Sequence, residues 1–400
     1  MAGATDGRPL RRVLLARGLR AFGDGFVSLL LPVYLLDLGF TPFQVGVIAT
    51  GTLLGSGALT LVVGRHAGRF HARTLLLAAA GAMAATGVGF AAIVEFWPLL
   101  VVAVVGTLNP SSGDVSVFLP LEHAMLARCA PQERRTAWFA RYSLVGALLA
   151  AGGALAAGVP QLLVRWTPLS MHAALQIMFV VYALLGLACM AIYRALPSDP
   201  VEASDARHAP LTQSRRVVYT LAALFSVDAF AGGFIVQSML ALWLFQRFQL
   251  SIVTAGAIFF WTGVFSALSY LVAVKIADRI GLVYTMVFTH LPSSVLLILV
   301  PFAPDLASAV ALLLARSALS QMDVPTRSSF VMAMVAPHER AAAASLTSVP
   351  RSLAAAASPL FAGYLLGASA FGWPLIVAGG LKIAYDLAFL ALFRRHAATR

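Results

Sequence analysis

The sequence predicts an all-α membrane protein with twelve transmembrane helices in two pseudo-symmetric six-helix halves. The 400 residues are 60% hydrophobic and 11% charged, with a mean hydropathy of +0.87. Soluble globular proteins carry about 25% charged residues. Apolar runs of about 20 residues, long enough to cross the hydrocarbon of a bilayer, recur along the chain. Related stretches 206–209 residues apart indicate an internal repeat.

One sizeable polar segment, 194–216, is rich in Pro, Ser, Asp and Arg and predicts a cytoplasmic linker between the halves 1–193 and 217–400. The apolar runs on either side give six expected helices each. In chain order they are 15–37, 43–63, 74–94, 98–127, 136–158, 169–193, 217–245, 252–274, 282–302, 306–335, 341–366 and 374–393.

The basic residues predict the orientation. The connections between consecutive expected helices are numbered from the N-terminus. Nineteen Lys and Arg residues lie in the termini and the even-numbered connections, whereas Arg165 and Arg247 lie in the odd-numbered connections. Short cytoplasmic loops carry such an excess, so we expect both termini inside a cell (inner or plasma) membrane. The net charge of +12 is explained by these loops, and we expect no nucleic-acid partner. The sequence shows no phosphate loop, nucleophile elbow or metal-ligand spacing, which argues against an enzyme.

A charged stripe lies in the expected helix 306–335. At about 100° per residue, Arg316, Ser320, Asp323 and Arg327 share one face. Such a face should point into the bundle or a water-filled cavity, because charge exposed to lipid costs several kcal/mol. The positions 209 residues earlier are held by Thr107, Ser111, Asp114 and Phe118, and Pro131-Gln-Glu133-Arg134 matches Pro337-His-Glu339-Arg340.

The loop between the second and third helices reads Gly64-Arg-His-Ala-Gly-Arg69-Phe-His-Ala-Arg73, and its copy contains Asp278, Arg279 and Gly281. These residues resemble the Gly-x-x-x-Asp-Arg-x-Gly-Arg-Arg/Lys loop of the major facilitator superfamily. The first copy lacks the Asp and the second Gly of that pattern, so the gate latch that the resemblance implies shifts toward Asp278 and Arg279. A second pattern, typical of exporters of the family, is matched only by small residues near Pro359 on the eleventh helix; plain packing explains it equally well.

The resemblance covers the whole chain and implies a transporter that rocks its two halves around a midplane site. It implies a small-molecule substrate, a monomer in the lipid bilayer and no cofactor, with the proton gradient as energy source.

The candidates for proton coupling are buried ionisable residues. Asp323 and Arg327 lie one turn apart, either as a working pair or as a static one. Asp114 has no local Arg, and a lone carboxyl in a low dielectric can hold a proton. Glu122 either couples protons or pairs with Arg128 or Arg141. Asp24, which can pair with Arg20, completes the set. Lys382 and Asp386, one turn apart on the last expected helix, are not candidates, because we expect them to neutralise each other.

Candidates for the substrate cavity are polar or aromatic residues on the first, fourth, seventh and tenth helices. Arg316 suits an anionic group. Asp228, which aligns with Arg20, faces either the cavity or a loop Arg. Packing is the alternative for the aromatic members. The remaining candidates are Ser320, Ser111, Gln237, Phe26 and Phe234.

Three functions are compatible with these features. The first is a secondary-active transporter that exports a small organic molecule in exchange for protons. The second is the same fold working as a proton symporter or facilitator for uptake of a metabolite, for which the deep Arg residues favour an anionic solute. The third is a receptor or accessory protein without transport.

Overall fold

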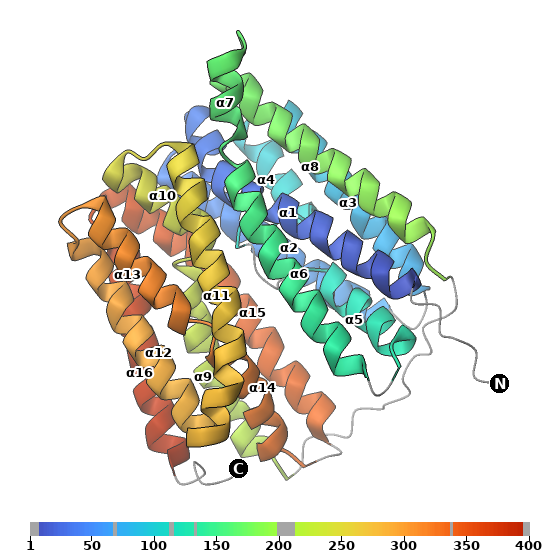
Figure 1. Cartoon of the computed structure of the whole chain (residues 1–400), viewed down its shortest axis with the longest axis vertical. Helices are drawn as coiled ribbons and strands as arrows, with labels where there is room; N and C mark the ends of the chain where they lie inside the picture. Colours follow the sequence, from blue (N-terminus) through green and yellow to red (C-terminus); the bar gives the residue numbers. More distant parts are fainter. Residues whose placement is uncertain are drawn as a thin grey trace. The chain divides into compact units, whose positions relative to one another are not determined.

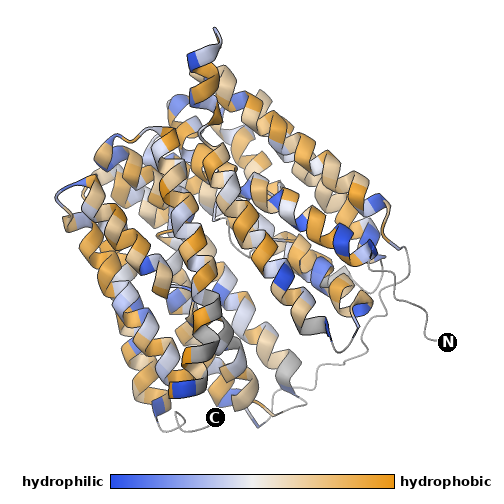
Figure 2. Cartoon of the chain, viewed as in Figure 1, coloured by the Kyte–Doolittle hydropathy of each residue, from blue (hydrophilic) through white to orange (hydrophobic). Residues whose placement is uncertain are grey.

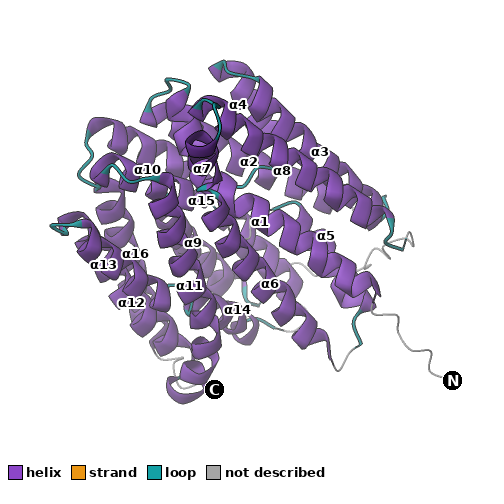
Figure 3. Cartoon of the chain, turned by 45° about the horizontal axis from the view of Figure 1, so that its top comes forward, coloured by secondary structure: helices purple, strands orange, loops and turns teal. Residues whose placement is uncertain are grey.

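A computed structural model of the chain describes residues 8–66, 70–111, 116–131, 134–197, 213–336 and 339–394. Within these ranges every regular element is a helix (Figure 3). Nine helical stretches are long and apolar enough to cross a membrane, and Phe96–Val105 and Leu306–Leu319 are shorter apolar helices. Most of the helical ribbon is hydrophobic (Figure 2). The predicted multi-pass helical fold is therefore confirmed.

The chain divides into two compact units, of which the first comprises Met1–Ser204 with Leu250–Phe260. In this unit α1 packs closely against α6 and α8, and α3 packs closely against α8. Its helices (Figure 1) are α1 (Arg8–Asp37), α2 (Pro42–His66), α3 (Ala72–Ala92), α4 (Phe96–Val105), α5 (Phe118–Cys129), α6 (Arg135–Ala156), α7 (Val159–Trp166) and α8 (Met171–Arg194).

The second unit comprises Asp205–Gln249 with Trp261–Arg400. Here α9 packs against α15, and α12 packs against α16 and α13. Its helices are α9 (Arg215–Gly233), α10 (Gln237–Phe248), the part of α11 (Ile252–Ile280) after Phe260, α12 (Leu282–Leu299), a 3₁₀ turn (Val300–Phe302), α13 (Leu306–Leu319), α14 (Asp323–Met334), α15 (Arg340–Ala368) and α16 (Trp373–Phe393). The predicted linker falls largely on 198–212, outside the described residues, so its role stays a prediction.

Three helices predicted as continuous are interrupted. The stretch 98–127 forms α4 and α5, 217–245 forms α9 and α10, and 306–335 forms α13 and α14. The interruptions follow from residues that cannot continue a helix. Gly106 and Pro110 follow α4, and two glycines end α9. Pro325 lacks the amide that would bond to Gln321 in an uninterrupted helix.

A capping box begins α13. The Asp305 carboxylate accepts a hydrogen bond from the Ser308 amide at 2.8 Å, and the Asp305 amide donates back to the Ser308 hydroxyl at 3.4 Å. Because these bonds favour the ionised form, they lower the pKa of the exposed Asp305 side chain below its ordinary value. This end of the helix is thus fixed independently of the interior of the bundle.

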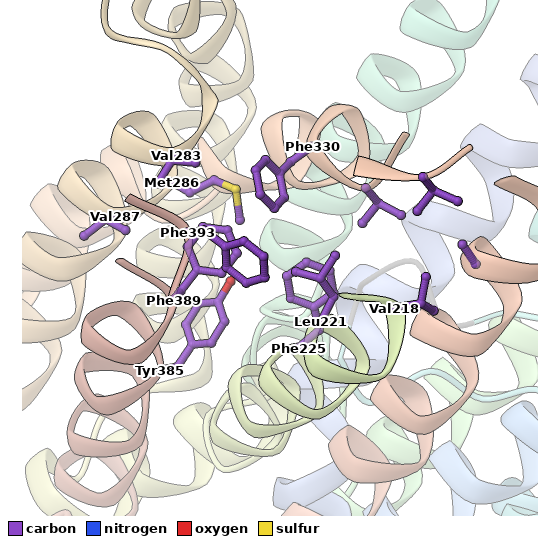
Figure 4. Close-up of a cluster of buried hydrophobic side chains, with 13 residues drawn as sticks. Val218, Leu221, Phe225, Val283, Met286, Val287, Phe330, Tyr385, Phe389 and Phe393 are labelled. Carbon is purple, nitrogen blue, oxygen red and sulfur yellow. The ribbon is translucent and has the colours of Figure 1, made fainter. Parts of the chain in front are cut away.

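Aromatic and branched side chains form the core of the second unit (Figure 4). The Phe330 ring lies edge-on to Phe389 and Phe393, with centroids 5.3 and 5.4 Å apart. Phe225 of α9 and Tyr385 of α16 extend the cluster, with ring centroids 6.5 Å apart. The cluster joins α9, α12, α14 and α16, which are the helices that also carry the buried charges described below.

Small residues set the closest helix crossings, as is common between membrane helices. A Cβ added at Gly25 of α1 would lie 2.1 Å from the Ala150 carbonyl oxygen, and one at Gly153 of α6 would lie 2.1 Å from the Phe22 carbonyl oxygen. Both positions require glycine because the two backbones are in contact. The close packing of α1 and α6 therefore depends on these two residues.

The small residues near Pro359 have the same role in the second unit. The Ser358 hydroxyl of α15 donates to the Phe230 carbonyl oxygen of α9 at 2.5 Å. A Cβ at Gly233 would lie 2.3 Å from the Ala355 carbonyl oxygen. These contacts explain the exporter-like spacing as packing of α9 against α15, so the spacing supplies no information on the direction of transport.

Neighbouring glycines of α6 provide a matched test of this packing. We expect Gly153→Ala to lower the free energy of unfolding by about 1–3 kcal/mol, because the new methyl group overpacks the contact with α1. Gly152→Ala is the control, since a Cβ there meets nothing within 4 Å. Thermal unfolding in detergent measures both. Equal melting temperatures for the two variants would contradict the proposed crossing.

Candidate functional site

Glu122 is the hub of a buried polar network in the first unit. It lies on α5 and is 0% exposed. Arg20 of α1 forms an ion pair with its Oε2 atom. Tyr142 of α6 donates a hydrogen bond to the same oxygen at 2.5 Å, and Tyr193 of α8 donates to Oε1 at 2.6 Å. Three donors thus satisfy this carboxylate, which is the condition under which a buried charge is tolerated.

Two pairings predicted from the sequence are wrong at this site. Arg20 forms its ion pair with Glu122 and not with Asp24, although Asp24 is one turn away on α1. Within the described residues Glu122 pairs with neither Arg128 nor Arg141. The reason is tertiary, because α5 packs against α1 and brings the carboxylate to the guanidinium. Spacing along one helix cannot reveal a partner on another.

Asp24 is buried but weakly held. The Tyr182 hydroxyl of α8 lies 3.4 Å from its Oδ1 atom and 3.4 Å from the Thr107 carbonyl oxygen. No ion pair of Asp24 is found in the described part of the chain. Phe26, predicted as a cavity residue, is fully buried with its ring edge-on to Tyr182 at 6.5 Å. The role of Asp24 in proton coupling therefore stays a prediction.

The connection between α4 and α5 carries two other candidates. The Ser111 amide and hydroxyl both donate to Asn109 Oδ1, at 3.0 and 2.7 Å. Asp114 lies outside the described residues, so its role in proton coupling stays a prediction.

Asp228 of α9 is the hub of the network in the second unit. Lys382 of α16 donates to its Oδ1 atom at 2.8 Å, and Arg327 Nη1 of α14 lies 3.4 Å from its Oδ2 atom. Asp228 thus faces helix residues of its own unit and no loop Arg. Arg327 also forms the predicted ion pair with Asp323. This pair is therefore part of a larger network and is not isolated on its helix.

His290 completes this network and was not predicted from the sequence. Its Nδ1 atom lies 2.9 Å from Asp386 Oδ1, and its Nε2 atom lies 3.3 Å from Lys382 Nζ and 3.6 Å from Asp228 Oδ1. The prediction that Lys382 and Asp386 neutralise each other is wrong, because each has its main partner on another helix. The sequence contained a signal for His290, because an ionisable residue within an apolar span is by itself a candidate functional residue.

The interruption between Leu319 and Asp323 changes the predicted charged stripe. Arg316 and Ser320 belong to the end of α13, whereas Asp323 and Arg327 belong to α14, so the four do not share one helix face. The Ser320 hydroxyl donates to the Ser317 carbonyl oxygen at 3.4 Å. Arg316 has a buried Nε atom without a hydrogen-bond partner and forms no ion pair in the described part of the chain.

The two units contain related ion pairs of opposite sign. In the first unit α1 supplies the cation Arg20 and α5 the anion Glu122. In the second unit α9 supplies the anion Asp228 and α14 the cation Arg327. The spacing of 208 residues from Arg20 to Asp228 matches the repeat, whereas Glu122 and Arg327 are 205 residues apart and Arg327 itself aligns with Phe118, one turn before Glu122. The ion pair thus joins α1 to α5 in the first unit and α9 to the corresponding helix α14 in the second, with the two charges exchanged.

The remaining cavity candidates lie near the interruption of α9 and α10. Phe234 is buried and packs against Phe230 and Phe361, with ring centroids 5.3 and 6.5 Å apart. Gln237 is the first residue of α10 and is partly buried. Packing accounts for the aromatic residue, while the role of Gln237 stays a prediction.

The gating candidates are described in part. Gly281 has φ +83°, a conformation that favours glycine, and it precedes α12. Arg73 lies in the first turn of α3, and Arg279 is exposed at the end of α11. Gly64 lies in α2 and Asp278 in α11, with side chains outside the described set, and Arg69 lies outside the described residues.

Apolar spanning helices with ion pairs buried between them define the class of this protein, a polytopic membrane transporter. Residues 13–236, more than half of the chain, match the model of the Major Facilitator Superfamily. The chain belongs to this superfamily and is a membrane transporter rather than an enzyme.

Individual relatives are distant. The chain is 24% identical to the uncharacterized membrane protein YJR124C of Saccharomyces cerevisiae, covering 94% of this chain and 92% of that protein. Among solved structures, a mutant of the nucleoside transporter NupG is 15% identical, with a TM-score of 0.77 over 96% of this chain and 99% of that one. The human organic anion transporter MFSD10 is 18% identical, with a TM-score of 0.67 over 96% and 99%. These structures share the fold.

The network around Glu122 predicts a strong coupling between two charges. We expect Glu122→Gln to lower the free energy of unfolding by about 3–5 kcal/mol, because it leaves Arg20 buried without a counter-charge. Adding Arg20→Met should recover much of this loss. Chemical unfolding in detergent micelles measures the single and double variants. A double variant whose loss equals the sum of the two single losses would contradict the assigned pair.

Proposed function

We propose that this transporter moves a small organic molecule in exchange for protons, with export as its direction. One observation carries the proton coupling: Asp228, Asp323 and Asp386 are buried with Arg327, Lys382 and His290 in one contact network. This network joins α9, α12, α14 and α16.

Proton binding to such a network changes which helices are held together. Neutralising Asp323 would remove the ion pair with Arg327, and the guanidinium would then have only Asp228 as a counter-charge. Arg327 could then pair more closely with Asp228, which would change the contact between α14 and α9. A carboxylate that gains and loses a proton can thereby bias two conformations. In this proposal Asp323 gates proton movement through its pairing with Arg327, with Asp114, Asp24 and Glu122 as further candidates in the first half.

The unpartnered guanidinium of Arg316 supports a second candidate, uptake of an anionic metabolite together with protons. Arg316 is partly buried and has no counter-charge in the described part of the chain, and such a cation attracts a carboxylate or phosphate group. Solved relatives include an organic anion transporter and a nucleoside transporter, which supports a small organic solute in either direction.

The resemblance supplies the remaining parts of the proposal. The protein acts as a monomer in a cell membrane, with both termini cytoplasmic and no cofactor. The loop residues Gly64, Arg69, Arg73, Asp278, Arg279 and Gly281 close the cytoplasmic side.

A growth assay tests the function and its direction. We expect the native chain, expressed in bacteria that lack their major efflux pumps, to confer resistance to some members of a panel of toxic organic compounds. Asp323→Asn should reduce this transport about tenfold or more, since a factor of ten corresponds to only about 1.4 kcal/mol. Asp305→Asn is the matched control, because Asp305 is exposed and Asn also caps helices.

Membrane levels of all three proteins are measured by immunoblot. Increased sensitivity to a toxic metabolite analogue would show uptake and contradict export as the direction of transport. Equal transport by the native protein and Asp323→Asn, at equal membrane levels, would contradict the role of Asp323.

Arg316 is tested by the charge dependence of recognition. We expect Arg316→Ala to weaken transport of an anionic substrate by roughly 10–100-fold in KM, the value of one or two hydrogen bonds to a charged group. Arg316→Lys should retain part of the affinity because it keeps the charge. Concentration-dependent uptake into proteoliposomes measures both. An equal effect on neutral and anionic solutes would show that Arg316 does not bind the anion.

A further inference from the structure

We propose that His290 is the residue that takes up the proton, and that the protonated imidazole competes with Lys382 for Asp228. This inference rests on the proposed proton coupling and names the group that performs it.

The contacts of His290 define which of its nitrogens is protonated. An ammonium group has only donors, so the 3.3 Å contact between Lys382 Nζ and His290 Nε2 requires the lone pair of Nε2 to accept. The ring hydrogen is then on Nδ1, from which it is donated to Asp386 Oδ1 at 2.9 Å. His290 is therefore neutral in this arrangement, and its tautomer is fixed from both sides.

The next proton must bind to Nε2. An N–H there would point at the Lys382 ammonium, a like charge 3.3 Å away. Asp228 Oδ1 lies 3.6 Å from Nε2 and 2.8 Å from Lys382 Nζ. The imidazolium would therefore donate to Asp228 while Lys382, still carrying its three protons, leaves that oxygen. Binding of one proton thus changes the partner of Asp228 from Lys382 on α16 to His290 on α12.

The charges around His290 favour this exchange. The contact network holds three carboxylates, those of Asp228, Asp323 and Asp386, and two permanent cations, Arg327 and Lys382. A proton on His290 adds a third positive charge, so that the net charge of the network becomes zero.

The elements packed against α12 supply few other ionisable groups. On α16 the Tyr385 ring lies 6.0 Å from the imidazole, and on α13 Arg316 is linked to α12 only through its carbonyl oxygen, which accepts from Ser293 at 3.5 Å. Arg351 of α15 interacts with Asp228 and Asp323 over a longer distance, and its side chain is exposed. These groups leave His290 as the one imidazole within the described network.

The first unit provides the contrast. Its hub, Glu122, accepts from one guanidinium and two hydroxyl groups at once. His123 lies edge-on to the Tyr142 ring, with centroids 5.0 Å apart, but the three described donors to Glu122 include no histidine. The exchange of partners on protonation is therefore a property of the second unit, and the related pair in the first unit holds its helices together.

The tautomer is tested without any substrate, by nitrogen NMR of the purified protein in lipid nanodiscs with ¹⁵N-labelled histidine. The signals missing from His290→Gln, or from His290→Asn as a second variant, identify the residue. We expect a neutral Nδ1–H ring at pH 8 that becomes charged as the pH falls. His172→Gln is the control, since this histidine pairs with Asp37 at 2.7 Å outside the network.

Lys382→Met then tests the competition. Without the ammonium the imidazolium loses a repulsion, so the pH midpoint of His290 should move upward by about one unit or more. A neutral ring with hydrogen on Nε2, or an unchanged midpoint in Lys382→Met, would overturn the proposal.

Proteoliposomes separate this inference from the proposed function. With a substrate identified in the growth assay, His290→Gln should abolish transport driven by a pH gradient but retain exchange of labelled for unlabelled substrate. If a pH gradient did not change the transport rate of the native protein, the proposed function itself would be contradicted. A native protein and a His290→Gln variant that respond equally would leave proton coupling intact and overturn only the role of His290.

Discussion

The cost of a charge in a low-dielectric interior is the constraint on which this structure depends. Every buried carboxylate in the two described networks has a donor, which lies on another helix except for Asp323, whose partner Arg327 is one turn away on α14, because an unpaired charge would cost several kcal/mol. Glu122 and Asp228 meet this requirement through partners on three different helices each. Helix packing and charge pairing are therefore linked, and a change in one alters the other.

The two units meet this constraint in different ways. The first surrounds Glu122 with permanent donors, whereas the second includes the imidazole of His290 between Asp386 and Lys382. The pairs Arg20–Glu122 and Asp228–Arg327 join corresponding helices of the two units with their signs exchanged. We interpret the first network as structural and the second as the part that responds to protons.

The sequence was sufficient for the helical bundle and its repeat because apolar length and loop charge are local properties. It located Asp228, Glu122 and the Asp323–Arg327 pair as buried ionisable groups. It could not give their partners, since Arg20 with Glu122 and Lys382 with Asp228 meet only through tertiary packing. The interruption before Asp323 and the role of His290 were missed for the same reason: a helical wheel assumes a continuous helix and sees one helix at a time.

Proton movement accompanying transport is the central claim, and a pH-sensitive dye inside proteoliposomes measures it directly. When substrate is added to one side without an imposed pH gradient, the account predicts that the interior pH changes at a rate proportional to substrate flux. The sign of the change distinguishes exchange from symport. Substrate flux without any change in interior pH would contradict the account and leave a facilitator with a static charge network.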